Sequence, residues 1–141
     1  MEVSFGVIAL TGQIVNTSLR LKRVIDSFNS AEDAFVNLRF KLECTAQTCG
    51  AARQIIEDEE ESSDAPPSLL RKQGPVVLAE IDKSLRKLEE LLPESDIKGK
   101  KPRRARQGIH FLLKSDTMAT LSRHLDEEVF LLTTMLTLTV W

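Results

Sequence analysis

The chain has 141 residues, a length that fits one domain with a single core and is too short for two domains of ordinary size. Its 19 basic and 21 acidic side chains give a net charge of −2, which argues against a constitutive nucleic-acid binder. Two His, two Cys and no Tyr leave few groups from which an active site is built. The composition therefore favours an interaction or assembly domain over an enzyme.

Apolar residues recur by threes and fours along the first 28 residues and predict a long amphipathic helix. The predicted core stripe is interrupted only at Thr17 and consists of Val3, Val7, Leu10, Ile14, Leu21, Val24 and Phe28. The 17 residues from Val3 to Leu19 carry no charge, and as a helix they are about 25 Å long, near the lower limit of a membrane span. Gln13 and Asn16 make this segment too polar for spontaneous, permanent insertion.

Two interpretations of this first helix stay open. It is either an ordinary core helix, or a helix that packs in the bundle at rest and reaches a bilayer after release. In the second case its apolar side chains are the membrane-effector residues, namely Val3, Phe5, Val7, Ile8, Leu10, Ile14, Val15 and Leu19. We expect Ile8 and Val15, which lie beside the stripe, to have no role in the bundle.

A second helix is predicted after a tight junction near Asn29 and Ser30, which makes the first two helices antiparallel neighbours. Ser30 followed by Asp33 has the spacing of a helix N-cap. The predicted core stripe of this helix is Phe35, Leu38, Leu42, Thr45, Cys49, Ala52 and Ile56.

Cys49 lies on that stripe and Cys44 lies off it, about 140° away around the helix. This geometry does not favour a disulfide between them, and a buried, inert thiol is expected at Cys49. We expect no signal peptide at the start of the chain, because the acidic Glu2, and no basic segment, precedes the apolar run. We therefore expect a reducing, intracellular location.

A third helix is predicted from Pro75 to Pro93, with a separate helical turn over Ser68 to Lys72. Its stripe is Leu78, Ile81, Leu85, Leu88 and Leu92. A fourth helix is predicted from Ser115 or Asp116, either of which is a good N-cap. Its stripe is Met118, Leu121, Leu125, Val129, Leu132 and Leu136. The expected fold is an all-α, mainly antiparallel bundle of four long helices with one short extra segment.

Two charged runs separate these helices. Six acidic residues between Glu57 and Asp64, followed by Pro66 and Pro67, predict an exposed loop or a frayed helix end. Six basic residues follow the third helix, namely Lys98, Lys100, Lys101, Arg103, Arg104 and Arg106. They are read as a solvated connection, as contacts for anionic lipid headgroups, or as a nuclear-import or nucleic-acid segment. The short apolar patch from Ile109 to Leu113 is expected to dock on the bundle.

The sequence predicts no catalytic site, no metal site and no cofactor. Zinc ligands normally occur as CxxC or HxxxH pairs, and neither Cys44 with Cys49 nor His110 with His124 has that spacing. A phosphate-binding glycine motif is also missing. Beside Asp126 and Glu128, His124 is expected to form a surface ion pair. A third hypothesis is a thiol or metal enzyme, which the reactivity of the Cys49 thiol would test.

The final 13 residues, from Val129 to Trp141, are uncharged and contain no residue that normally ends a helix. We therefore interpret residues 1–141 as one helical domain and expect it to be the N-terminal part of a longer protein.

The opening segment MEVSFGVIALTGQIVNTSLRLKRVIDSFNSAEDAFVNLRFKLE resembles the N-terminal domains of fungal NOD-like receptors of the HeLo-like group. The closing segment IHFLLKSDTMATLSRHLDEEVFLLTTMLTL is similar to the family's closing pattern of an aromatic patch, a short polar break and a long Leu-rich helix, with Phe111 where these domains often have Trp. More distantly, the chain is similar to the HET-S HeLo domain and to the four-helix bundle of mixed-lineage kinase-domain-like proteins. The resemblance implies a bundle that self-associates when a downstream nucleotide-binding module triggers it.

On this resemblance, the function expected is that of a cytoplasmic signalling or cell-death effector without catalysis. It would relocate to the plasma membrane and damage it through the segment Val3 to Leu19, with an anionic membrane surface as partner and with no nucleic acid involved. The alternative is a helical adaptor that binds a partner protein and has no membrane activity.

Overall fold

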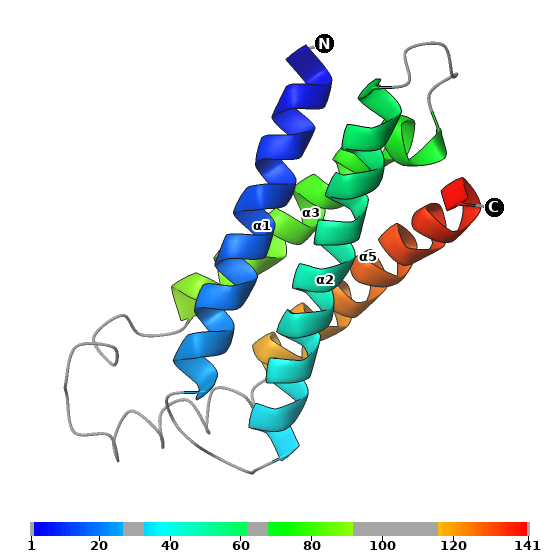
Figure 1. Ribbon diagram of the computed structural model, residues 1–141. Helices are drawn as coiled ribbons and strands as arrows, with labels where there is room; N and C mark the ends of the chain where they lie inside the picture. Colours follow the sequence, from blue (N-terminus) through cyan, green and yellow to red (C-terminus); the bar gives the residue numbers. More distant parts are fainter. Residues whose placement is uncertain (1, 27–32, 62–67, 92–115, 141) are drawn as a thin grey trace.

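The computed structural model describes residues 2–26, 33–61, 68–91 and 116–140. They form four helices, α1 (Glu2–Asp26), α2 (Asp33–Glu61), α3 (Leu69–Leu91) and α5 (Asp116–Val140). The helices pack against one another as a bundle (Figure 1). Within those ranges only Ser68 lies outside a helix, so the predicted all-α bundle of four long helices is confirmed. The junction at Asn29, Pro93, the basic run and the patch from Ile109 to Leu113 lie outside the described residues.

The core is one cluster of aliphatic side chains to which all four helices contribute. Its largest fully buried hydrophobic members are Ile14, Ile25, Leu42, Ile56, Leu70, Leu78, Ile81, Leu85 and Leu132. The predicted stripe of α2 is buried from Leu38 to Ile56, with Cys49 inside and Cys44 only partly covered. Both cysteines are free thiols, as predicted.

Two pairs of neighbouring residues, each with one residue from α1 and one from α2, show how the two helices lie along each other. Near the end of α1, Asp26 accepts a 3.4 Å contact from Arg39, close to the start of α2. Nearer the start of α1, a Cβ atom added at Gly12 would lie 3.5 Å from Nη1 of Arg53, in the second half of α2. The chain therefore turns back after α1, and α2 returns along it (Figure 1).

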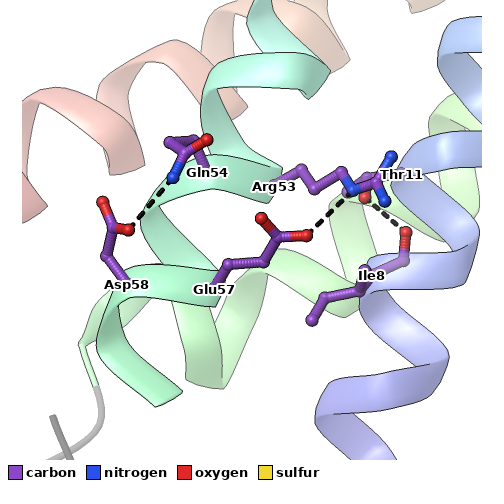
Figure 2. A network of polar contacts seen from close by, with 6 residues as sticks. All are labelled: Ile8, Thr11, Arg53, Gln54, Glu57 and Asp58. Atoms are coloured by element: carbon purple, nitrogen blue, oxygen red, sulfur yellow. Dashed lines mark hydrogen bonds and ion pairs between the residues drawn. The ribbon is translucent and has the colours of Figure 1, made fainter. Parts of the chain in front are cut away.

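The acidic run that was expected to be a loop or a frayed end is partly helical, since α2 continues to Glu61. Side chains one turn apart hold this part of the helix together. Arg53 Nε lies 3.2 Å from Glu57 Oε1, and Gln54 Nε2 donates to Asp58 Oδ1 at 3.0 Å (Figure 2). These contacts neutralise part of the charge repulsion in the run.

The prediction that the third helix begins near Pro75, after a separate turn, is wrong. α3 is continuous from Leu69, with Pro75 inside it. Ser68 caps this start, because its Oγ accepts a 3.2 Å hydrogen bond from the Arg71 amide and its carbonyl accepts one from the Lys72 amide at 3.1 Å. The extra turns bury Leu70 completely in the core, which offsets the backbone hydrogen bond that proline removes.

The predicted core stripe of α1 is also partly wrong. Leu10 and Val24 are only half-buried, whereas Thr11, Thr17 and Ser18 lie in the interior. Apart from Thr17, the buried positions follow a regular alternation of steps of four and three, namely Val7, Thr11, Ile14, Ser18, Leu21 and Ile25. A prediction based on hydrophobicity misses this period, because two of its first four positions, Thr11 and Ser18, carry a hydroxyl.

Candidate functional site

The eight side chains predicted as membrane-effector residues do not share one surface of α1. Val7 and Ile14 are buried in the core, and Leu19 is 41% exposed. Ile8, Leu10 and Val15 are half-buried and pack against the core cluster. The expectation that Ile8 and Val15 have no role in the bundle is therefore wrong, because both help to hold α1 in place. Val3 and Phe5 belong to α1, and their side chains lie outside the described part of the chain.

The buried face of α1 is unusual because hydroxyl groups occupy a large part of it. The hydroxyl of Thr11 donates a 2.7 Å hydrogen bond to the carbonyl of Ile8, within α1 itself (Figure 2). Ser18 is fully buried, and its Oγ has no hydrogen-bond partner among the described residues. A buried hydroxyl without a partner costs about 1–3 kcal/mol. α1 is thus held in the bundle by fewer apolar contacts than its length allows.

The facing surface of α2 carries a matching set of small side chains. The neighbour pairs Asp26 with Arg39 and Gly12 with Arg53 place Ser18 level with residues 45–49 of α2. In this stretch Thr45, Ala46 and Cys49 are buried, and the Thr45 hydroxyl donates to the Lys41 carbonyl at 2.7 Å. Small residues of α1 and α2 are therefore buried at the same level of the bundle, and Thr45, like Thr11, satisfies its hydroxyl within its own helix.

Between Gly6 and Leu19, where the side chains of α1 are described, its outward face carries no large apolar side chain before Leu19. The exposed positions of this stretch are Gly6, Ala9, Gln13 and Asn16. A Cβ atom added at Gly6 would have no neighbour within 4 Å, so packing inside this molecule does not require a glycine there. This face is open to a new neighbour that approaches α1 from outside the bundle.

Ion pairs hold the charged end of α1. Arg20 forms an ion pair and hydrogen bond with Glu89 of α3, and Lys22 lies 3.7 Å from Asp26. Arg23 is exposed and has no ion-pair partner among the described residues. Together with Asn16 and Leu19, these three basic residues line a shallow hollow on the surface. Both partners of the Arg20 pair are largely exposed, so the pair adds at most about 1 kcal/mol.

Cross-helix polar contacts also join α5 to its neighbours. Lys41 of α2 lies 2.9 Å from Asp126 and donates a hydrogen bond to the hydroxyl of Ser122. Ser84 of α3 donates a 2.7 Å hydrogen bond to Oε1 of Glu128. Burial raises the pKa of the Glu128 carboxyl above its ordinary value of 4.5, and the Ser84 hydrogen bond opposes that rise.

The groups that could support chemistry are few in the described residues. Burial raises the pKa of the Cys49 thiol to about 12, which keeps it protonated at neutral pH. In the parts of the chain with described placement, no three His, Cys, Asp or Glu side chains are grouped so that they could hold a metal ion. His124 is exposed and lines a groove between the end of α3 and the start of α5, with Lys87, Glu90 and Asp116.

The six basic residues predicted as lipid contacts, Lys98 to Arg106, lie outside the described residues. None of the helices that the structure describes is both long enough and apolar enough to cross a membrane. Comparison of the chain with protein-family models, with curated proteins and with solved structures found no match.

Proposed function

We propose that this chain is a non-catalytic helical effector that permeabilises membranes by releasing α1 from the bundle and assembling it with α1 of other copies. The observation that carries the proposal is the packing of α1. The uncharged part of α1 packs in the bundle through a face that includes Thr11, Thr17 and Ser18. The Ser18 hydroxyl has no hydrogen-bond partner among the described residues. The free energy needed to withdraw such a face is smaller than for an aliphatic face of equal length.

The internal hydrogen bond of Thr11 supports release as a helix. The bond to the Ile8 carbonyl is made inside α1, so it survives when α1 leaves α2 and α3. A polar group that carries its own partner costs less to move into an apolar environment than one that loses its partner. The helix therefore moves as a unit, with its hydrogen bonds intact.

Assembly of several copies is part of the proposal, since α1 alone is too polar to cross a bilayer. Gln13 and Asn16 lie on the exposed side of α1 in the bundle. Polar side chains inside a membrane face other helices or water, and rarely lipid. In an assembly these amides would lie at the contacts between neighbouring copies of α1, while Ile8, Ile14 and Val15 would face lipid.

The basic end of α1 gives the orientation of the proposed contact. Arg20, Lys22 and Arg23 follow directly after the uncharged length, and each basic residue near an anionic surface contributes about 1 kcal/mol to attraction. They would stay at the headgroups while the uncharged length enters the bilayer. The basic run from Lys98 to Arg106 would add to this attraction.

The proposal extends to the wider protein on the sequence resemblance alone. In this view the chain is a HeLo-like N-terminal domain of a fungal NOD-like receptor, located in the cytoplasm and relocating to the plasma membrane. A downstream nucleotide-binding domain in the same protein would trigger its assembly.

The alternative function is that of an adaptor whose helices bind a partner protein without membrane activity. Exposed apolar side chains away from α1 favour it, among them Phe40 of α2 and Val76 of α3. Such side chains are suited to contact with an amphipathic helix of another protein.

Dye release from vesicles distinguishes the two functions. The full chain, carrying a terminal histidine tag, is concentrated on anionic vesicles that contain a small fraction of nickel-chelating lipid. The effector predicts dye release that rises steeply with the surface density of the protein. Intact vesicles at the highest density would exclude the membrane function and leave the adaptor.

A further inference from the structure

The outward face of α5 changes character halfway along the helix. In the first half the exposed positions, apart from Ala119, are charged or polar, including Asp116, Thr120, Arg123 and Glu127. In the second half the exposed large side chains are apolar, with Phe130 71%, Leu131 51% and Leu138 60% exposed. Helical spacing places these three on one side together with exposed Thr134. We call these four residues the α5 patch.

The threonines in this half of α5 leave no free hydroxyl donor on the patch. Each hydroxyl donates to the backbone carbonyl four residues earlier, at 2.8 or 2.9 Å. The four residues are Thr133, Thr134, Thr137 and Thr139. The surface therefore exposes methyl groups and apolar side chains, and whatever covers it needs no hydrogen-bonding groups.

We propose that a second copy of this chain covers the α5 patch, with α5 packed antiparallel against α5 around Thr134. The proposal deepens the function proposed above and rests on it for the need to assemble. Two copies would first associate through the α5 patch, and α1 would take no part in that contact. A two-fold contact of this kind uses the same surface on both partners.

Charge selects the antiparallel arrangement. With Thr134 at the two-fold axis, Phe130 of each copy lies opposite Leu138 of the other. The two Glu127 side chains are then about 20 Å apart along the axis, which is beyond the screening length of about 8 Å at physiological salt. A parallel pairing would place the two Glu127 residues opposite each other and cost repulsion.

The same charges disfavour a bilayer as the occupant of the patch. The exposed Glu127 directly precedes it on the same side of α5, whereas helices that lie on anionic membranes carry mainly Lys and Arg beside their apolar face. A second copy brings an uncharged apolar surface of equal length, which is the chemistry that the patch requires.

The size of the patch sets the strength of the association. Four side chains from one helix fall well short of the roughly 800 Å² per partner that a stable complex buries. The dimer is therefore weak and forms only when copies are concentrated, as they would be by tethering to a receptor or a membrane. This dependence on concentration suits a contact that is used only after a trigger.

Sedimentation of Phe130→Ser and Phe40→Ser tests the surface. Phe40 is 66% exposed on α2, so its substitution is matched to Phe130→Ser in size, chemistry and exposure. We expect the wild-type chain and Phe40→Ser to self-associate with rising concentration, and Phe130→Ser to need at least about tenfold more protein. Equal association of the two variants, or a wild-type chain that stays monomeric at millimolar concentration, would overturn the proposal.

Cysteine cross-linking tests the arrangement. In a Cys44→Ser background, Thr134→Cys places a thiol at the two-fold axis, and Thr120→Cys places one on the same face outside the patch. Oxidation should link Thr134→Cys into covalent dimers and leave Thr120→Cys monomeric, while buried Cys49 stays unreactive. Linkage of both variants to the same extent would contradict an antiparallel α5 contact.

Vesicle tethering separates this inference from the function on which it rests. Copies clustered on nickel-chelating vesicles no longer need the patch to meet, so Phe130→Ser should still release dye there. Dye release without any contact through α5 in solution removes only the inference. A cross-linked α5 dimer that never releases dye removes only the membrane function.

Discussion

The hydroxyl of Ser84 donates a 2.7 Å hydrogen bond to the carboxylate of Glu128, and so joins α3 to α5. Burial has the largest effect on the pKa of that carboxyl, and it raises the pKa. Glu80 and Glu127 raise the pKa further, while the Ser84 hydrogen bond and His124 lower it. The contact holds two helices together at the expense of keeping a charge partly out of water.

A dependence of stability on pH follows from the raised pKa of Glu128. The Glu128 carboxyl has an ordinary pKa of 4.5, which applies to the unfolded chain. Its pKa is higher in the folded chain, so the folded chain binds this proton more tightly. The free energy of unfolding therefore falls as the pH rises from 4.5 through the raised pKa, and stays lower above it. Glu128→Gln should remove this contribution, because an amide stays neutral and still accepts the Ser84 hydrogen bond.

Urea unfolding of Glu128→Gln between pH 4 and pH 8 checks this prediction. The variant should be more stable than the wild-type chain at pH 7, and the difference should shrink toward pH 4. Glu43→Gln, at an exposed position of α2, is the control and should follow the wild-type curve. A Glu128→Gln variant that is less stable at pH 7 would show that the charged form contributes to the fold.

The buried hydroxyl of Ser18 predicts a stabilising substitution. Ser18→Ala removes a polar group without a hydrogen-bond partner, so it should raise the free energy of unfolding by about 1 kcal/mol. Ser122→Ala is the control, since it gains the same helix propensity as Ser18→Ala but loses a hydroxyl that accepts a hydrogen bond from Lys41. Thermal unfolding should show a higher Tm for Ser18→Ala alone. A lower Tm would mean that the Ser18 hydroxyl has a partner, such as a buried water.

The two thiols are predicted to differ in reactivity. Cys44 is partly exposed, whereas Cys49 is fully buried with its pKa raised to about 12. A thiol reagent at pH 8 should modify one cysteine quickly and the other at least about tenfold more slowly, with peptide mapping assigning the fast site to Cys44. Rapid modification of Cys49 in the folded chain would revive a thiol-based activity.

The sequence predicted the helices well where burial and hydrophobicity coincide. The period of the predicted stripes identified the buried faces of α2, α3 and α5, apart from Val129 and Leu136 of α5, which are half-buried. The start of α5 at Asp116 agrees with the N-cap predicted at Ser115 or Asp116. The start of α3 was missed because Pro75 was taken as a first-turn residue. The cap at Ser68 and the burial of Leu70 together favour the longer helix.

The candidate site was predicted less completely, for a related reason. Hydropathy describes α1 as an apolar helix with one interruption at Thr17, whereas Thr11 and Ser18 are also buried in the structure. The alternation of fours and threes through Thr11 and Ser18 was a signal available in the sequence. Which apolar side chains of α1 stay in contact with the core, such as Ile8 and Val15, depends on the packing of three helices.

The central claim, that α1 enters a membrane in an assembly, is tested most directly by a charge placed on its exposed uncharged face. Ala9→Asp adds that charge without touching the core, and Ala51→Asp adds the same charge to an exposed position of α2. Both variants should keep the helical content of the wild-type chain, because both positions face solvent. Dye release by tethered protein should fall at least about tenfold for Ala9→Asp and stay unchanged for Ala51→Asp, because the charges added at position 9 of neighbouring copies would repel one another where the α1 helices meet in the assembly. Equal dye release by the two variants would contradict an assembly of α1 helices in the membrane.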